Sequence, residues 1–292
     1  MYRLFTDTAA NLPLSYLREH GVGEIPFTFH RETGEQICMD VEGFDASAFY
    51  NAMRAGERIS TSQIPPAAYE EAFAPVLAQG EDVLFIGLSS GVSGSFQSAW
   101  NAARNLRERF PQRTIALIDT RGASLGEGMA VMEGVRLQGE GVSLEEAVPL
   151  LEEYCQRMCQ VFTVGDLRYL AATGRLSNAG AALGNILNIK PLLKGNEEGK
   201  IVSYAKIHGR KRTLKAILEQ YETYVEGASE QRVCISHGDC PEDAAMLETL
   251  LRESKTPPKE IFTVVHEPVT GSHVGPGMLA LYFIGSPAFR GK

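Results

Sequence analysis

The sequence predicts an α/β protein with two domains: an N-terminal doubly wound parallel sheet and a C-terminal mixed α/β sheet. In the first half, short apolar runs alternate with helical stretches, which is the rhythm of a parallel sheet covered by helices. The runs at 83–88 and 114–118 are continuously apolar, as in strands buried on both faces. The length of 292 residues fits two domains of roughly 150 residues each. We expect these domains at residues 1–160 and 161–292.

The first domain opens with a strand over 4–6 that ends at Asp7, and a second strand is expected over 24–29. Asp45 is a helix cap residue, and Pro65 is a typical helix opener. Further helices and strands are expected in the order helix 46–55, helix 65–78, strand 83–88, a helix to 109, strand 114–118 and helix 124–137. Because parallel strands share one carboxyl edge, Asp7, the segment 89–95 and Asp119 should lie near one another.

The second domain is less regular. Ser143 and Glu146 form a capping-box pattern at the start of a helix that reaches about residue 158. The polar segment 195–199 separates two apolar runs and predicts a hairpin. The expected elements are strands at 162–164, 190–193, 201–207, 233–235, 262–265 and 278–283, with a long helix over 211–225.

Composition excludes several classes of protein. The net charge of −8 argues against nucleic-acid binding as the main task, which needs a basic face. The five cysteines include no CxxC pair and are typical of free thiols in a reducing compartment. Cys155 and Cys159 are expected on one helix face, without further ligands at metal-site spacing, so no metal is expected. Neither a signal peptide nor a membrane-length apolar run is visible, so we expect a cytoplasmic protein.

The glycine-rich turn at 90–95 follows a strand and begins a helix. Ser93, Gly94 and Ser95 stand at this helix start, where unpaired N–H groups favour a phosphate or a carboxylate. The turn lacks the Walker lysine, and the GxSxG elbow fails because position 95 is serine. An ordinary turn with a serine cap explains the same residues, so both interpretations remain open.

Three other segments offer candidate ligand groups. Thr61 and Ser62 precede the Pro65-Pro66 pair and are either ligand donors or plain loop residues. His273 stands between flexible glycines beside a buried strand, placed to reach a cleft, although a lone histidine is more often structural. The stretch 206–215 has five basic and no acidic residues, Lys206 and Arg210 among them, and Arg175 is a further cation.

Taken in order, these segments resemble the DegV family of bacterial fatty-acid-binding proteins. No single motif is decisive, but the ordered set is specific and extends over nearly the whole chain. The matching segments are Thr6–Pro13, Thr61–Gln63, Ser89–Ser95, Asp119–Thr120, Leu125–Gly128, Gly174–Ser177, Leu187–Pro191 and Ser272–Gly277.

The resemblance implies that one long-chain fatty acid is buried in the cleft between two α/β domains. By motif, Thr61 and Ser93 would hold the carboxylate, His273 would lie by the headgroup, and Ser62, Gly94 and Ser95 would support the turn. The family pattern implies no cofactor and no catalysis of its own. Tail-lining residues cannot be assigned from motifs, so the chain length of the acid stays open.

The resemblance also implies a partner. A separate ATP-dependent fatty acid kinase would phosphorylate the presented carboxylate, and this protein would carry fatty acid or acyl-phosphate for phospholipid synthesis. Arg175, Lys206 and Arg210 are candidates for contact with that partner or with phosphate, and transient contact with a membrane surface is compatible with this role.

Two other functions use the same residues. A serine hydrolase or acyltransferase would need Ser93, His273 and Asp7 or Asp119 to converge as a triad. A phosphate-ligand enzyme, such as a sugar or nucleotide kinase, would use the glycine turn alone. The missing Walker lysine argues against this function. Covalent labelling of Ser93 would identify the first, and direct nucleotide binding the second.

Overall fold

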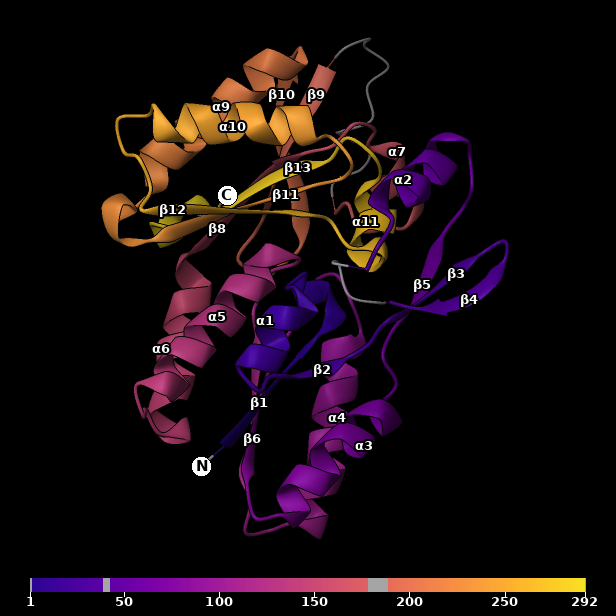
Figure 1. Ribbon diagram of the computed structural model, residues 1–292, viewed down its shortest axis with the longest axis vertical. Helices are drawn as coiled ribbons and strands as arrows, with labels where there is room; N and C mark the ends of the chain where they lie inside the picture. Colours follow the sequence, from indigo (N-terminus) through magenta and orange to yellow (C-terminus); the bar gives the residue numbers. More distant parts are fainter. Residues whose placement is uncertain (1, 39–42, 178–188, 292) are drawn as a thin grey trace. The chain divides into compact units, whose positions relative to one another are not determined.

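The computed structural model describes residues 2–38, 43–177 and 189–291. The chain divides into two compact units, one of residues 1–44 and 59–155, the other of residues 45–58 and 156–292. The first contains a parallel sheet and the second a mixed sheet, so the predicted α/β class is confirmed (Figure 1). The boundary near residue 160 stays a prediction. Leu187 and Asn188, in one of the family-like segments, lie outside the described residues.

The main sheet of the first unit has the order β2-β1-β6-β7, with all strands parallel. Its strands are β1 (Tyr2–Asp7), β2 (Gly23–Ile25), β6 (Asp82–Gly87) and β7 (Ile115–Asp119). Val83 to Ile86 are fully buried, which explains the unbroken apolar run. Gly87 pairs with Asp119 at the carboxyl edge, where β1 also ends at Asp7. The predicted clustering of strand ends at this edge is confirmed.

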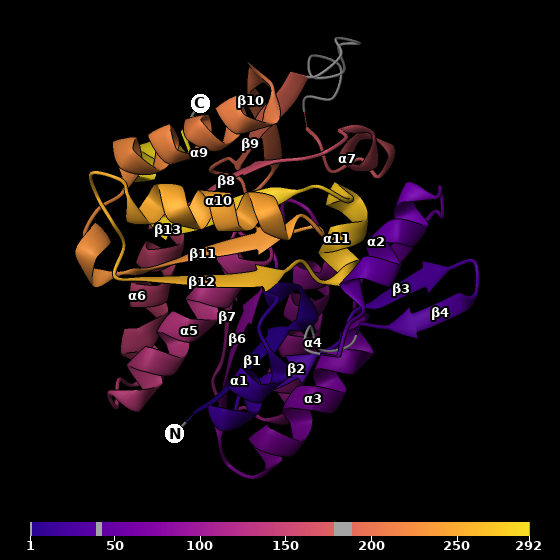
Figure 2. The ribbon, with the colours of Figure 1, turned by 45° about the horizontal axis from the view of Figure 1, so that its top comes forward.

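Helices cover both faces of this sheet. In Figures 1 and 2, α3 (Pro66–Ala78) and α4 (Ser95–Arg109) lie on one side, and α5 (Leu125–Gly139) and α6 (Leu144–Arg157) on the other. The short α1 (Leu14–Glu19) lies against β2, and a 3₁₀ turn (Thr8–Ala10) follows β1. The capping box of α6 is confirmed, because Glu146 N donates to Ser143 Oγ at 3.3 Å and Ser143 N donates to Glu146 Oε2 at 3.2 Å.

A small antiparallel sheet in the first unit was not predicted. It has the order β4-β3-β5 and consists of β3 (Thr28–Arg31), β4 (Gly34–Ile37) and β5 (Ser60–Ser62). The single strand expected over 24–29 is therefore wrong. The break falls at Pro26, between β2 and β3, because proline has no N–H to donate to a strand ladder.

The second unit contains a six-stranded sheet in the order β10-β9-β8-β13-β11-β12, in which only β11 and β12 pair in parallel. The strands are β8 (Met158–Thr163), β9 (Ile189–Gly195), β10 (Ile201–His208), β11 (Arg232–His237), β12 (Glu260–Val265) and β13 (Leu279–Ile284). Since α6 ends at Arg157, Cys155 is helical and Cys159 lies in β8. The expectation that these two thiols share a helix face is wrong.

Two long helices cover this sheet and bury its core. Figure 2 shows α9 (Arg210–Tyr224) and α10 (Pro241–Arg252) side by side, and both contribute leucines to the cluster around Phe283. Among the described residues of this unit from 156 onward, the remaining helical elements are α7 (Arg168–Ala172), α11 (Pro268–Val274) and 3₁₀ turns at Ala228–Glu230 and Pro287–Phe289. Among the described helices, none combines the length and apolar character needed to cross a membrane.

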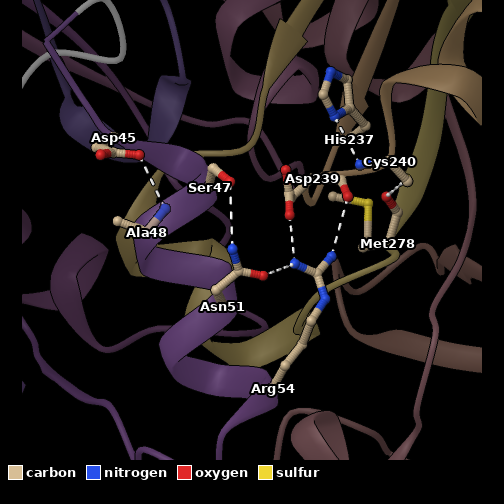
Figure 3. Close-up of polar contacts among 9 residues, drawn as sticks. All are labelled: Asp45, Ser47, Ala48, Asn51, Arg54, His237, Asp239, Cys240 and Met278. Atoms are coloured by element: carbon tan, nitrogen blue, oxygen red, sulfur yellow. Dashed lines mark hydrogen bonds and ion pairs between the residues drawn. The ribbon is translucent and has the colours of Figure 1, made fainter.

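The helix α2 (Ala46–Arg54) belongs to the second unit although it comes early in the chain. As expected, Asp45 caps it, accepting from Ala48 N at 2.9 Å. At its other end, the Arg54 guanidinium pairs with the Asp239 carboxylate and donates to the Asp239 carbonyl at 3.1 Å (Figure 3). Asn51 accepts from the same guanidinium at 2.8 Å. These bonds tie α2 to the loop after β11.

Candidate functional site

Aspartates at the ends of two parallel strands hold the loops around the predicted anion site. Asp119 accepts hydrogen bonds from Ser90 N at 3.1 Å, Ser90 Oγ at 2.6 Å and Arg121 N at 3.0 Å. Asp7 accepts from Ala9 N at 3.0 Å and Leu88 N at 3.2 Å. Both carboxylates therefore fix backbone loops at the carboxyl edge of the sheet.

The turn before α4 is organised by two serines. Ser93 Oγ donates to Ser95 Oγ at 3.0 Å and accepts from Ser95 N at 3.2 Å, so it bonds the first residue of α4, while Gly94 is the N-cap residue. Gly94 has a φ of −75°, which any residue can adopt, so this glycine is not needed for the backbone bend. The first turn of α4 provides N–H groups that the helix itself does not use.

The Thr61–Ile64 segment lies against this turn. Ile64 N donates to Ser95 Oγ at 3.1 Å, and a Cβ added at Gly94 would lie 2.3 Å from Gln63 Oε1. Ser62 Oγ is 2.7 Å from His30 Nε2, and Thr61 faces the opposite side of β5, since side chains alternate along a strand. The structure thus brings Thr61, Ser62, Ser93, Gly94 and Ser95 into one region of the first unit.

His273 and Arg175 come together in the second unit. His273 lies in α11, so the prediction of a histidine in a flexible glycine loop is wrong; the helix ends just after it, at Gly275, with a φ of 75°. Burial, followed by the charge of Arg175, lowers the pKa of His273 to about 4. The imidazole is therefore neutral at pH 7 and can donate one hydrogen bond beside a guanidinium.

The other two predicted cations lie elsewhere in this unit. Lys206 is exposed on β10, an edge strand of the six-stranded sheet. Arg210, at the start of α9, pairs with Asp243 at 2.8 Å. Its charge is thus partly compensated by a neighbouring acid, which the sequence stretch 206–215 does not reveal.

Glu127 is a buried acid that the sequence analysis missed. It is fully buried in α5 and accepts from Thr6 Oγ1 at 2.9 Å. Burial, and then the Asp7 charge, raises the pKa of this carboxyl group well above its usual value. A single acid within the otherwise small and apolar stretch 125–131 was the available signal.

Glu267 is a second missed acid, also fully buried. Its carboxylate accepts from Val269 N and Thr270 N and so caps α11, the helix of His273. The signal was an acid directly before Pro268, since proline favours the first helical position.

Each unit by itself contains groups suited to binding an anion. The first unit provides hydroxyl groups and helix N–H groups, and the second provides a neutral imidazole beside a guanidinium. Within the described ranges, no group of three or more His, Cys, Asp or Glu side chains could hold a metal ion.

Comparison with known proteins decides the family. Residues 1–286 match the family described as "Uncharacterised protein, DegV family". The chain belongs to the DegV family. A DegV domain-containing protein of Clostridium perfringens is 36% identical over 97% of both chains, and one of Lactococcus lactis is 31% identical over the same shares.

Solved DegV structures share the fold. A DegV family protein from Thermus thermophilus, described as binding fatty acid, superposes with a TM-score of 0.89 at 29% identity, covering 98% of this chain and 99% of its own. DegV of Bacillus subtilis, described as a fatty acid binding protein, gives 0.83 at 27% identity with the same coverage.

Proposed function

We propose that this DegV-family chain binds a long-chain fatty acid and holds its carboxylate with Thr61 and Ser93. The observation that carries the proposal is the likeness over nearly the whole chain to the Thermus protein, which is described as binding fatty acid. The hydroxyl groups gathered at the start of α4 support it, because a hydroxyl rotates to suit its acceptor, so Ser93 Oγ can exchange its bond to Ser95 Oγ for one to an anion.

The proposed ligand suits these donors. A carboxylate can be held by hydroxyl and N–H groups without a fixed ion pair, and a neutral His273 adds one more donor. Each methylene buried from water contributes about 0.8 kcal/mol, so a long tail supplies most of the affinity. The carboxylate contacts then decide which end of the ligand is recognised.

We further propose a cytoplasmic carrier without catalysis of its own, which presents the acid to a separate ATP-dependent fatty acid kinase. The acyl-phosphate formed would serve phospholipid synthesis, with transient contact at a membrane surface. The five cysteines, all among the described residues, form no disulfide, which favours a reducing compartment. Arg175, Lys206 and Arg210 are the proposed partner or phosphate contacts. With ATP alone, the bound acid should stay unchanged; its phosphorylation without a kinase would contradict the carrier role.

Removing single hydroxyls tests the carboxylate site. We expect Thr61→Ala and Ser93→Ala each to weaken fatty-acid binding by about 10- to 100-fold, the loss typical of a hydrogen bond to a charged group. Mass spectrometry of lipid extracted from the purified protein identifies the acid, and titration of delipidated protein measures the affinity.

Ser60→Ala is the matched control, since Ser60 is exposed on the same strand as Thr61. It should bind like the parent protein. Repeated purification without lipid, together with no uptake after delipidation, would overturn the proposal.

A hydrolase using Ser93 and His273 is the alternative. The hydroxyl of Ser93 donates to the Ser95 hydroxyl, an arrangement that does not by itself activate a nucleophile. An activated phosphonate should therefore leave Ser93 unlabelled in the folded protein, and labelling of Ser93 would favour the hydrolase.

A further inference from the structure

A chain of buried polar groups lies beneath the helix that carries His273. Tyr282 OH is 2.9 Å from Ser236 Oγ, and Ser236 Oγ is 3.0 Å from His266 Nδ1. His266 Nε2 is 2.7 Å from Thr270 Oγ1, whose hydroxyl donates to the Glu267 carboxylate. These groups join β13 and β11 to the start of α11.

The direction of this chain follows from its last member. A carboxylate only accepts hydrogen bonds, so the Thr270 hydroxyl donates to Glu267. The Thr270 oxygen then accepts a hydrogen bond from the N–H of His266 Nε2. Burial lowers the pKa of His266 to about 3, so the ring is neutral and Nδ1 accepts from Ser236. Ser236 in turn accepts from Tyr282. Each donor group in the chain therefore donates its hydrogen bond in the same direction, from the sheet toward the cap of α11.

The helix above the chain depends on such contacts. A seven-residue helix is too short to be stable by itself, so tertiary contacts must set its place and rotation. Tyr50 OH donates to the His266 carbonyl at 2.9 Å, and Gly277 N donates to the Gly238 carbonyl at 2.7 Å beyond the helix end. Thr270 and His273 are three residues apart and therefore share a face of α11.

We propose that this hydrogen-bonded chain is the positioning device for His273: Ser236, His266 and Thr270 set the rotation of α11 so that the imidazole meets a carboxylate in one orientation. The inference rests on the proposed function, because it concerns how the headgroup of a fatty acid is recognised. Apolar packing alone would hold the helix against the sheet with less control of its rotation, whereas a satisfied polar chain permits one arrangement.

The test compares a fatty acid with its methyl ester, which has the same tail but no charge. We expect Ser236→Ala and Thr270→Val to weaken binding of the acid by about tenfold and of the ester by less than about twofold. Thr270→Ser keeps the hydroxyl and should restore binding of the acid. Tyr282→Phe removes only the outermost donor of the chain, so it should weaken binding of the acid in the same way but less. It is the variant to use if Ser236→Ala fails to fold.

Thr213→Val is the control, because Thr213 is equally buried in this unit but bonds only within its own helix turn, to the Gly209 carbonyl. It should change neither affinity. An equal loss for acid and ester in Ser236→Ala would show a general structural role and overturn the inference.

A second readout separates this inference from the proposed function. The imidazole nitrogen resonances of His273 report its tautomer and environment without any ligand. These resonances should shift in Ser236→Ala and in Thr270→Val. In Thr270→Ser they should return to their positions in the parent protein. Unchanged resonances would overturn the positioning role, whereas failure of the unaltered protein to bind any fatty acid would overturn only the proposed function.

Discussion

At the residue scale, Glu127 and Asp7 form a pair of buried acids in the first unit. Asp7 is stabilised by two backbone N–H groups, from Ala9 and Leu88. Glu127 receives one hydroxyl, from Thr6, and its pKa is raised by burial and by the Asp7 charge. The two carboxyls therefore differ in their surroundings: Asp7 accepts from two backbone N–H groups, whereas burial and the Asp7 charge shift Glu127 toward its protonated form.

Replacing Glu127 tests this difference. In the unfolded chain a glutamate releases its proton near pH 4.5, whereas folded Glu127 retains it. The folded state then binds more protons, so the unfolding free energy falls as pH rises above that value, by up to about 1.4 kcal/mol per pH unit. Glu127→Gln lacks this titration, so its stability relative to the parent protein should increase from pH 5 to 8 in urea unfolding.

Glu140→Gln serves as the control, because the Glu140 side chain is 56% exposed on the same helix. Loss of its exposed ion pair with Arg136 should change stability by less than about 1 kcal/mol at any pH from 5 to 8. A pH-independent difference for Glu127→Gln would show that Glu127 is already ionised in the folded state.

At the element scale, α4 and the preceding turn form the framework of the candidate carboxylate site. After the end of β6, Asp119 holds the turn by hydrogen bonds to Ser90, and Ser93 Oγ accepts from the first amide of α4, that of Ser95. Gly94 is required here for space, since its backbone conformation is ordinary and the Gln63 side chain lies against it. The glycine permits the Thr61 segment to approach the helix start.

We therefore expect Gly94→Ala to alter binding more than stability. The new methyl group would displace Gln63, an exposed and flexible side chain, at a cost of less than about 1 kcal/mol in unfolding free energy. Displacement of the Thr61 segment should lower fatty-acid affinity by about tenfold. The double variant Gln63→Ala/Gly94→Ala makes room for the methyl group and should recover affinity. A loss of stability above about 3 kcal/mol would contradict this account.

At the scale of the whole molecule, the buried titratable groups of the two units shift stability with pH in opposite senses. Buried His266 and His273 have pKa values of about 3 and about 4, both lowered mainly by burial, against an ordinary value of 6.5. Their unfolded forms bind protons first as pH falls, so acid destabilises the second unit. In the first unit, the raised pKa of Glu127 has the reverse effect.

Hydrogen exchange, measured separately for each unit, tests this contrast. Between pH 7 and pH 4, His266 alone should remove roughly 3 kcal/mol from the stability of the second unit. Amide protection in β11 and β13 should therefore fall before that in β1 and β6. Trp100, the single tryptophan, lies in α4 and reports the first unit by fluorescence. Simultaneous loss of both signals would contradict the prediction.

Sequence patterns predicted most of the elements because helix and strand formation follows local periodicity and caps. The Asp45 cap and the Ser143–Glu146 capping box were recovered residue by residue. Errors occurred where one residue changed the backbone path: Pro26 separated two strands, and the chain became extended at Met158. The helix around His273 was missed because its glycines indicated a loop.

The candidate site was only partly predictable. Thr61, Ser93 and His273 follow from motif resemblance, and their role in holding a carboxylate stays a prediction. The hydrogen-bonded chain from Tyr282 to Glu267 left almost no sequence signal, because its members come from three separate elements. The sequence around Arg210 contains no acid that could pair with it, whereas in the structure Asp243, 33 residues further along the chain, accepts a hydrogen bond from it.

The sequence alone determined the α/β class, the DegV resemblance and the residue types gathered at the strand ends. The tertiary structure decided which side chains meet: Thr6 reaches Glu127 across 121 residues, and Ser236 reaches His266 and Tyr282. The physical reason is that backbone conformation depends on neighbours in the chain, whereas the burial and pairing of polar groups depend on how distant elements pack. The protonation states of Glu127, His266 and His273 also depend on how distant elements pack, because burial is the largest cause of their pKa shifts.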